Sequence, residues 1–192
     1  AGAFTAAGNN AIVDWVLVEL RDAATGQNIV ATRSALVQRD GDVVAEDGAS
    51  PIAIEAVPGN YKVAVRHRNH LGAMASASVA LTTAPTSVDL SLPATAAYGS
   101  EGRKTVGART VLWAGNALRD AVLRYTGGDN DRDPILVRVG GAVPTNTVAG
   151  YWPEDVNLDG VVKYTGPAND RDPILVNIGG TVPTSTRAEQ LP

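Results

Sequence analysis

The C-terminal part of the chain is duplicated, and this duplication limits the possible folds more than any other feature of the sequence. Residues 113–148 align with residues 152–187 at an offset of 39 positions, and 20 of the 36 aligned residues are identical. The shared frame consists of a Trp, a Tyr-Thr-Gly turn, the string Asn-Asp-Arg-Asp-Pro-Ile-Leu-Val and a Gly-Gly pair. A frame kept in both copies predicts a paired scaffold.

A short helix is expected in each copy after its Asp-Pro pair. Asp133-Pro134 and Asp172-Pro173 place a carboxylate at the N-cap and a proline at the first helical position. Ile-Leu-Val follows, and the Gly-Gly pairs at 140–141 and 179–180 are typical of a helix C-terminus. Because a helix of about two turns is not stable alone, we expect the copies to pack as a pseudo-twofold pair.

The second copy also contains the start of a cation-binding loop. Asp155, Asn157 and Asp159 place an oxygen ligand at every second residue, and Gly160 follows them. This spacing opens an EF-hand-type calcium loop, in which Val161 would contribute its backbone carbonyl. The sequence therefore predicts Ca²⁺ as the bound ion.

This loop lacks a closing acid at the usual place. The twelfth loop position should carry Glu or Asp, but it is Gly166. The nearest downstream acids are Asp170 and Asp172, four and six residues late. We expect these two residues to share cation ligation and helix capping, in a division that the sequence leaves open.

The first copy keeps only part of the ligand set. Leu118 replaces the middle ligand and cannot bind a cation through its side chain, and Ala121 replaces the glycine. Calcium binding by this copy, weak or purely structural, remains an open alternative. Its candidate ligands are Asn116, Asp120, Asp131 and Asp133.

Other residues that recur in the frame are assigned structural roles. Arg132 and Arg171 are expected to form ion pairs with the carboxylates beside them in the sequence. The recurring aromatic residues are expected to pack in the core or between the repeats rather than to bind sugars. These are Trp113, Trp152, Tyr125 and Tyr164.

Residues 113–187 resemble dockerin modules, in which two D-x-N-x-D-G calcium loops, each followed by a short helix, form a pseudo-symmetric pair. The matching residues are Asp155, Asn157, Asp159, Gly160 and the helix expected near Pro173. The chain departs from dockerins in its late closing acid, its longer Trp-led loop and its incomplete first copy. The resemblance implies a calcium-stabilised module of the kind found in large secreted bacterial surface proteins. Dockerins usually bind cohesins, but no residue here identifies a cohesin-binding face.

Residues 11–92 predict an antiparallel β-sandwich, with Trp15 in its core. Apolar runs alternate with turn signals such as Arg39-Asp40-Gly41-Asp42 and Pro58-Gly59-Asn60. About seven short strands at this spacing are typical of a sandwich. The expected strands include residues 11–20, 29–37, 51–57, 61–67, 73–82 and 87–92.

The string AVPGNYKVAVRH is similar to the turn before a core strand in transthyretin-like and carboxypeptidase-regulatory-like sandwiches. This resemblance implies a fold and no function. Together with the duplication it predicts three parts of the chain: a sandwich domain with a flexible N-terminal tail (1–96), a linker rich in small and polar residues (97–110), and the calcium repeat module (111–192).

Composition excludes several kinds of function. The 192 residues are 44% hydrophobic and 19% charged, which is ordinary for a folded protein. A net charge of −4 gives no reason to expect nucleic acid as a partner, and no apolar run is long enough to span a membrane. The absence of cysteine excludes disulfides, and with a calcium loop it favours a secreted, cell-surface protein whose signal peptide has been removed.

We expect a non-catalytic structural or adhesion protein. No nucleophile, phosphate loop or open metal site is recognisable, and His67 and His70 are assigned to a surface loop. The expected partner is protein, through self-association or a parent surface assembly. In a fibre, the apolar tail of residues 1–10 would add as a strand to a neighbour's sheet edge. The alternatives are a carbohydrate-binding module and a cohesin-type protein-binding module.

Overall fold

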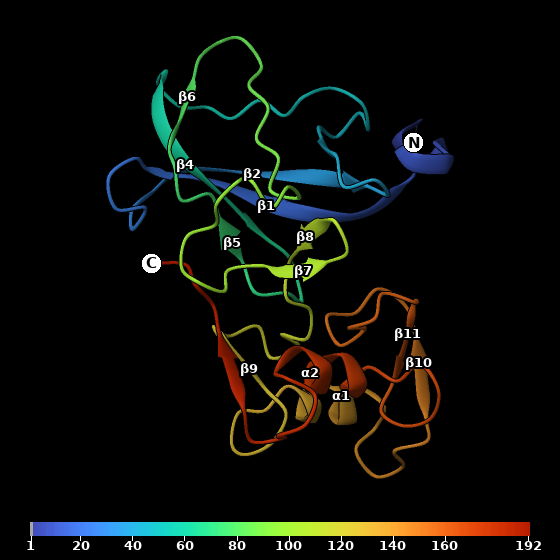
Figure 1. Ribbon diagram of the computed structural model, residues 1–192. Helices are drawn as coiled ribbons and strands as arrows, with labels where there is room; N and C mark the ends of the chain where they lie inside the picture. Colours follow the sequence, from blue (N-terminus) through green and yellow to red (C-terminus); the bar gives the residue numbers. More distant parts are fainter. Residues whose placement is uncertain (1) are drawn as a thin grey trace. The chain divides into compact units, whose positions relative to one another are not determined.

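Alternating apolar residues near the N-terminus form the centre of an antiparallel sheet in the computed structural model, which describes residues 2–192 (Figure 1). The sheet has the strand order β3-β2-β1-β4-β5, and β6 also pairs with β4. These strands are β1 (Ile12–Asp22), β2 (Ile29–Gln38), β3 (Val43–Val44), β4 (Gly59–Arg66), β5 (Ala73–Met74) and β6 (Val79–Leu81). The mainly-β class and the antiparallel pairing predicted from the sequence are confirmed.

The chain divides into two compact units. Unit 1 comprises residues 1–67, 72–111 and 190–192, and unit 2 comprises residues 68–71 and 112–189. Unit 1 therefore contains the sheet, and unit 2 contains the duplicated segment. Residues 97–110 were predicted to form a linker, but they include strand β7 (Lys104–Val106). This strand pairs with β8 (Arg109–Val111) in a hairpin of unit 1.

One face of β1 carries the core of unit 1. Val16, Val18 and Leu20 are buried on this face, where they pack with Ala35 of β2 and other apolar residues. Trp15 points to the opposite face, because successive side chains of a strand alternate. Trp15 is 42% exposed, so the prediction of a core tryptophan is wrong.

Some predicted strands of unit 1 are extended chain without strand pairing. In residues 51–57, Ile52, Ile54 and Ala56 pack against the core while their neighbours are exposed, yet no ladder forms. Pro51 and Pro58 bracket this segment and lack the N–H group that a ladder needs. Residues 87–92 also form no strand, and residues 73–82 are divided between β5 and β6.

Unit 2 contains the same series of elements twice. Each repeat runs from a short strand through a seven-residue helix to a second short strand. The first repeat has β9 (Val122–Arg124), α1 (Arg132–Arg138) and β10 (Thr147–Ala149). The second repeat has β11 (Val161–Lys163), α2 (Arg171–Asn177) and β12 (Thr186–Ala188).

The two repeats exchange their last strands. β10 of the first repeat pairs with β11 of the second, and β12 of the second pairs with β9 of the first, in the same antiparallel register. The side chains repeat this symmetry: Thr126 Oγ1 donates to the Pro183 carbonyl at 2.9 Å, and Thr165 Oγ1 donates to the Pro144 carbonyl at 3.0 Å. The predicted pseudo-twofold pair is confirmed, and each repeat completes the other.

Both repeats contribute to one apolar core. Ile135 of α1 and Ile174 of α2 are equivalent residues, and both are fully buried. Val162 of β11 is also fully buried in this cluster. A second cluster places Leu123 of β9 beside Leu71, which belongs to the short segment 68–71 of the same unit.

The helices begin two residues earlier than predicted. Asp131 is the N-cap of α1, so Pro134 is the third helical residue rather than the first. Asn130 does the capping, because its Oδ1 accepts the N–H groups of Arg132 and Asp133 at 3.2 Å each. Proline is tolerated here because N–H groups of the first turn have no partner within a helix. The second repeat is built in the same way with Asn169, Asp170, Arg171 and Asp172.

Truncation of one shared core residue should destabilise both repeats together. Ile174→Ala is expected to lower the free energy of unfolding of unit 2 by about 2–5 kcal/mol, because it leaves a cavity in a core that both repeats line. Val176→Ala, in the same helix but 58% exposed, is the matched control and should cost less than about 0.5 kcal/mol. Denaturant unfolding followed by circular dichroism measures both. Equal effects of the two substitutions would contradict the shared core.

Candidate metal centre

Two equivalent loops lead into β9 and β11 and include these short strands: the first loop, residues 116–124, and the second loop, residues 155–163. Each loop bends at a non-glycine residue with positive φ, Arg119 at 62° in the first and Leu158 at 61° in the second. This backbone conformation costs such a residue about 1–2 kcal/mol. Interactions elsewhere in each loop must therefore hold the bend.

The second loop gathers its three predicted side-chain ligands around the bend. Asp155 accepts hydrogen bonds from the N–H groups of Asp159 (3.1 Å) and Gly160 (3.0 Å). Asn157 Oδ1 accepts from the same Asp159 N–H at 2.8 Å, so two ligand oxygens meet at one point. Asp159 Oδ1 in turn accepts the Val161 N–H at 2.9 Å.

The Val161 carbonyl lies on the loop side of β11. The N–H of Val161 points to Asp159, and the N–H of Lys163 points to Asp170 Oδ2 at 2.7 Å. Backbone groups of successive strand residues point to opposite sides, and Val162 between them faces β10. The carbonyl of Val161 is therefore directed to the same side as the predicted ligands.

Asp170 closes the second loop. This residue is completely buried, and its Oδ1 accepts the N–H groups of Val156 (2.7 Å) and Asn157 (3.1 Å). Its Oδ2 accepts the N–H of Lys163, so one carboxylate joins the loop, β11 and the start of α2. Burial raises the pKa of this carboxyl to about 6, and the neighbouring charge of Asp155 adds to the effect.

Asp172 has a different role. Its Oδ2 accepts a hydrogen bond from Asn169 Nδ2 at 2.8 Å, and it lies in the first turn of α2, where a negative charge is favoured. Among the described residues, the hydrogen-bond partner of Asp172 is Asn169 rather than any of residues 155–163. The geometry thus divides the two acids: Asp170 faces the loop, and Asp172 stabilises the helix.

The second loop carries more negative charge than its side chains neutralise. Asp155 is 2% exposed and Asp170 is fully buried, yet both accept only backbone N–H groups. Among the described residues, the cationic side chain paired with an acid of this loop is Lys163, whose Nζ lies 3.4 Å from Asp159 rather than from the buried pair. Buried carboxylates without a cationic partner are unfavourable, so this loop has the electrostatic character of a cation site.

The first loop is closed by different chemistry. Asn116 Oδ1 accepts the N–H of Asp120 (3.0 Å), as Asp155 accepts that of Asp159, but Asn116 Nδ2 donates to the Asp120 carbonyl (2.6 Å). The peptide after Asp120 therefore turns its carbonyl toward the first ligand position, whereas the peptide after Asp159 turns its N–H there. The second arrangement uses a φ of +85° at Gly160, which glycine adopts readily.

The remaining first-repeat candidates follow the pattern of the second repeat. Asp131 is fully buried and accepts the N–H groups of Leu118 (3.1 Å) and Arg124 (2.8 Å), as Asp170 does in its loop. Asp133 accepts a hydrogen bond from Asn130 Nδ2 at 2.9 Å and belongs to the helix start. Asn116, Asp120 and Asp131 therefore gather at the first loop, and Asp133 does not.

The donor set of the second loop fits Ca²⁺ in kind, although the side chains now bind amides. Within residues 2–192, no group of three or more His, Cys, Asp or Glu side chains is arranged to hold a metal ion. The carboxylates of the loop instead accept backbone N–H groups. Hard oxygens from two carboxylates, one amide and one carbonyl are nevertheless the ligands that Ca²⁺ prefers, and it tolerates flexible geometry.

The recurring arginines stack on aromatic rings instead of pairing with acids. Arg132 lies over Tyr125 at 4.6 Å and Arg171 over Tyr164 at 4.5 Å from the ring centroids. The predicted ion pairs are wrong, because a planar guanidinium that covers a ring is drawn away from the carboxylates beside it in the sequence. The predicted packing role of the aromatics is confirmed, since both tyrosines pack against the shared core.

The two histidines belong to different units. His67 belongs to unit 1, where its side chain is 6% exposed and its Nε2 lies 3.0 Å from Asp14 Oδ2. The assignment to a surface loop is therefore wrong for His67, whose acidic partner comes from β1 rather than from the neighbouring sequence. His70 belongs to unit 2, where its Nδ1 lies 2.8 Å from Asn69 Oδ1.

Comparisons of the chain with models of protein families, with curated proteins and with solved structures found no match. The resemblance to dockerin modules therefore depends on the loop residues themselves. Among residues 2–192, neither helix is long and apolar enough to cross a membrane. Function has to be inferred from the geometry and charge of the two loops.

Without calcium, unit 2 should become less stable as the pH rises from about 4 to 6. Burial raises the pKa of Asp131 to about 6, against an ordinary value of 3.8, so the unfolded chain loses this proton first. The loss of stability is about 1–3 kcal/mol for Asp131, and Asp170 adds a similar amount. The pKa values of Asp47 and Asp89 are lowered, so these groups act mainly below this range.

Urea unfolding in a chelator at stepped pH values measures this effect. Asp131→Asn should make the pH dependence shallower, because only the Asp170 contribution remains. A stability that is constant or rises between pH 4 and 6 would contradict the buried, unneutralised carboxylates.

Proposed function

We propose that the protein is a non-catalytic, extracellular structural or adhesion module in which calcium stabilises the repeat pair of unit 2. The observation that carries this proposal is the pair of buried carboxylates, Asp155 and Asp170, without a cationic side chain against them. A divalent cation would neutralise them. In the first loop, Asn116 stands in place of one acid, so of the equivalent pair Asp131 alone is a buried carboxylate.

The side-chain oxygens of Asp155, Asn157 and Asp159 and the carbonyl of Val161 would hold the ion. When bound, calcium supplies positive charge and cross-links the loop. Asp170 positions the loop by holding the N–H groups of Val156, Asn157 and Lys163. Because the same loop continues into β11, which pairs with β10 of the other repeat, stabilising the loop stabilises the pair.

This arrangement suits a protein outside the cell. A loop that lacks the usual bidentate closing acid is expected to bind calcium weakly, in the range of extracellular modules. Such a site is filled where calcium is millimolar. Calcium then acts as a constitutive stabiliser rather than a signal.

Calcium should stabilise unit 2 through the second loop. The free energy of unfolding is expected to rise by about 3 kcal/mol when free calcium exceeds its Kd a hundredfold. Asp155→Ala combined with Asp159→Ala should abolish this rise, and the matched first-loop variant, Asn116→Ala with Asp120→Ala, should retain it. Calorimetry with calcium or with a chelator measures the difference. A wild-type chain unaffected by calcium would reject the site.

The geometry of β2 supports self-association, in which the partner is a second copy of the chain. β3 pairs with β2 only at Leu36 and Val37, so the edge of residues 29–35 carries no further strand in the described chain. The N–H of Gln38 donates to the Asp42 carbonyl on the β3 side of β2. Because the N–H groups of successive strand residues point to opposite sides, the N–H of Thr32 points to the same side as that of Gln38, where residues 29–35 have no partner strand in the described chain. Such an edge accepts an added strand.

The N-terminal segment is the proposed donor for a fibre. Residues 2–5 and 8–10 form two short 3₁₀ helices, η1 (Gly2–Thr5) and η2 (Gly8–Asn10), and residue 1 lies outside the described part. The Ala11 carbonyl accepts the Arg39 N–H at 2.9 Å. The segment therefore lies beside the sheet and would have to unwind to pair with a neighbour.

Fibre formation should depend on both the tail and the open edge. Deletion of residues 2–10 is expected to abolish polymers in negative-stain images. Thr32→Pro should do the same by removing an outward N–H, at little cost to the folded chain, and Thr32→Ala is its control. Unchanged polymers in the deletion variant, or no polymers of the intact chain, would sink the added-strand version.

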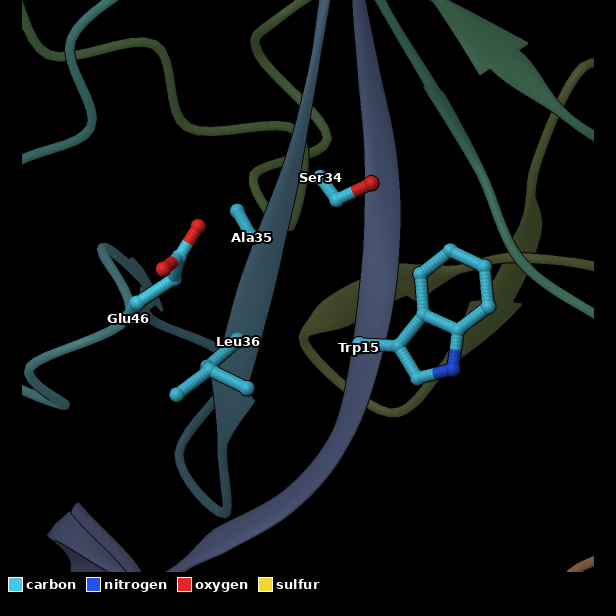
Figure 2. A pocket seen from close by; sticks show the side chains of 5 residues that line it. All are labelled: Trp15, Ser34, Ala35, Leu36 and Glu46. Atoms are coloured by element: carbon cyan, nitrogen blue, oxygen red, sulfur yellow. The ribbon is translucent and has the colours of Figure 1, made fainter. Parts of the chain in front are cut away.

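Two alternative functions each have one supporting observation. For carbohydrate binding, Trp15 lines a shallow surface hollow of about 240 Å³ together with Ser34, Ala35, Leu36 and Glu46 (Figure 2). For a cohesin-type protein-binding module, the equivalent residues Val137 and Val176 of the two helices are 73% and 58% exposed. A single exposed tryptophan and two exposed valines are weaker arguments than the charge of the second loop.

A further inference from the structure

The first loop contains its own cation. Arg124, the ninth residue of this loop, places Nη1 3.3 Å from Asp120 Oδ2 and 3.4 Å from the carbonyl of Asp129. The guanidinium thus connects the bend of the loop with the segment that leads into α1. Its side chain is about one-third exposed, so this is a partly solvated contact.

In the second loop, the equivalent oxygens have a different partner. Asn157 Nδ2 lies 3.3 Å from Asp159 Oδ2 and 2.8 Å from the carbonyl of Ala168. Asp159 and Ala168 are the equivalents of Asp120 and Asp129. Leu118 stands where Asn157 would be and has no polar atom to offer, so in the first loop the guanidinium takes over both contacts.

The basic residue of the second loop does not do the same. Lys163 is equivalent to Arg124, but in the described part of the chain its ammonium group pairs with Asp159 alone, at 3.4 Å. A lysine is a point charge, whereas the planar fork of an arginine can reach a carboxylate and a carbonyl together. In the second loop the side chain that spans these oxygens is therefore the uncharged amide of Asn157, and Lys163 brings its charge to one of them, Asp159.

Charge and peptide orientation agree with this difference. The first loop has two acids, Asp120 and Asp131, against the guanidinium, and the amide of Asn116 closes the remaining contact by donating to the Asp120 carbonyl. Ala121 is compatible with this peptide orientation, because its φ is not positive, whereas the equivalent Gly160 has a φ of +85°. None of these contacts requires a metal ion.

We propose that the first repeat is held without metal, because the Arg124 guanidinium supplies to its loop the positive charge that a bound cation would supply to the second loop. Asn116, Leu118, Ala121 and Arg124 are then the residues that decide between the two closures. The inference rests on the proposed function in one respect: the second loop is taken as the cation-binding loop with which the first loop is compared. It implies that a chain with two repeats binds one calcium ion.

Exchange of the four deciding residues tests the proposal on the full chain. Equilibrium dialysis with radioactive calcium should give one ion per wild-type chain. The variant Asn116→Asp, Leu118→Asn, Ala121→Gly and Arg124→Lys, checked for folding by circular dichroism, should bind two. Two ions on the wild-type chain, or no additional ion on the folded variant, would overturn the proposal.

A second measurement does not depend on calcium binding. Arg124→Met removes the charge and keeps the length of the side chain, and it should lower the Tm of unit 2 by about 1–4 °C in chelator and in calcium alike. Arg119→Met, which removes an exposed charge from the same loop, is the control and should leave the Tm unchanged. Equal Tm values for the two variants would overturn the role of Arg124.

The two measurements separate the two proposals. A wild-type chain that binds no calcium, together with a lowered Tm for Arg124→Met, would reject the calcium function and support the metal-free first loop. One ion per chain together with an unchanged Tm would do the reverse.

Discussion

One buried aspartate in each repeat holds the architecture of unit 2 together. Asp131 and Asp170 are fully buried, and each accepts backbone N–H groups from the loop and from the strand that follows it. Each is also the residue at which its helix begins. Burial makes the negative charge unfavourable in this position and thereby raises the pKa of both carboxyls. The loop, the strand and the helix are therefore fixed relative to one another by a group that other interactions must keep in place.

The two loops form the same bend, but the hydrogen bond at the first ligand position runs in opposite directions. At the first ligand position, Asn116 offers a donor to a carbonyl, whereas Asp155 offers an acceptor to an N–H. The residue type at this position and the glycine or alanine five residues later are thus two parts of one choice about a single peptide. The two loops thus differ in ligand pattern within the same duplicated frame.

Much of this scaffold is readable from the sequence. The shared frame predicts the pairing, the Asp-Pro strings predict the helices, and the alternation of Ile52, Ile54 and Ala56 predicts which side chains reach the core. The predictions that are wrong concern features that depend on backbone segments distant in the sequence. Residues 51–57 have the right alternation but no neighbour to pair with, and Trp15 lies on the outer face because β1 places Val16 inward.

The candidate site shows the same limit. The spacing of Asp155, Asn157 and Asp159 is a local signal, and the structure brings these residues together. The separation of Asp170 from Asp172 depends on where the helix starts, and Asn169 rather than an aspartate decides that. A basic residue at the ninth position of both loops is present in the sequence, but its reach toward Asp120 and the Asp129 carbonyl becomes visible only once the loop is folded.

The strand exchange also has a consequence for how the chain acquires its structure. β9 lies at the start of the duplicated segment, and its partner β12 lies at the end; Thr126 and its acceptor Pro183 are 57 residues apart. Contacts between such distant residues are slow to form, because a long loop must close first. A chain emerging from a ribosome would hold the first repeat incomplete until the second had followed. Maturation of this unit is thereby tied to the arrival of its last strand.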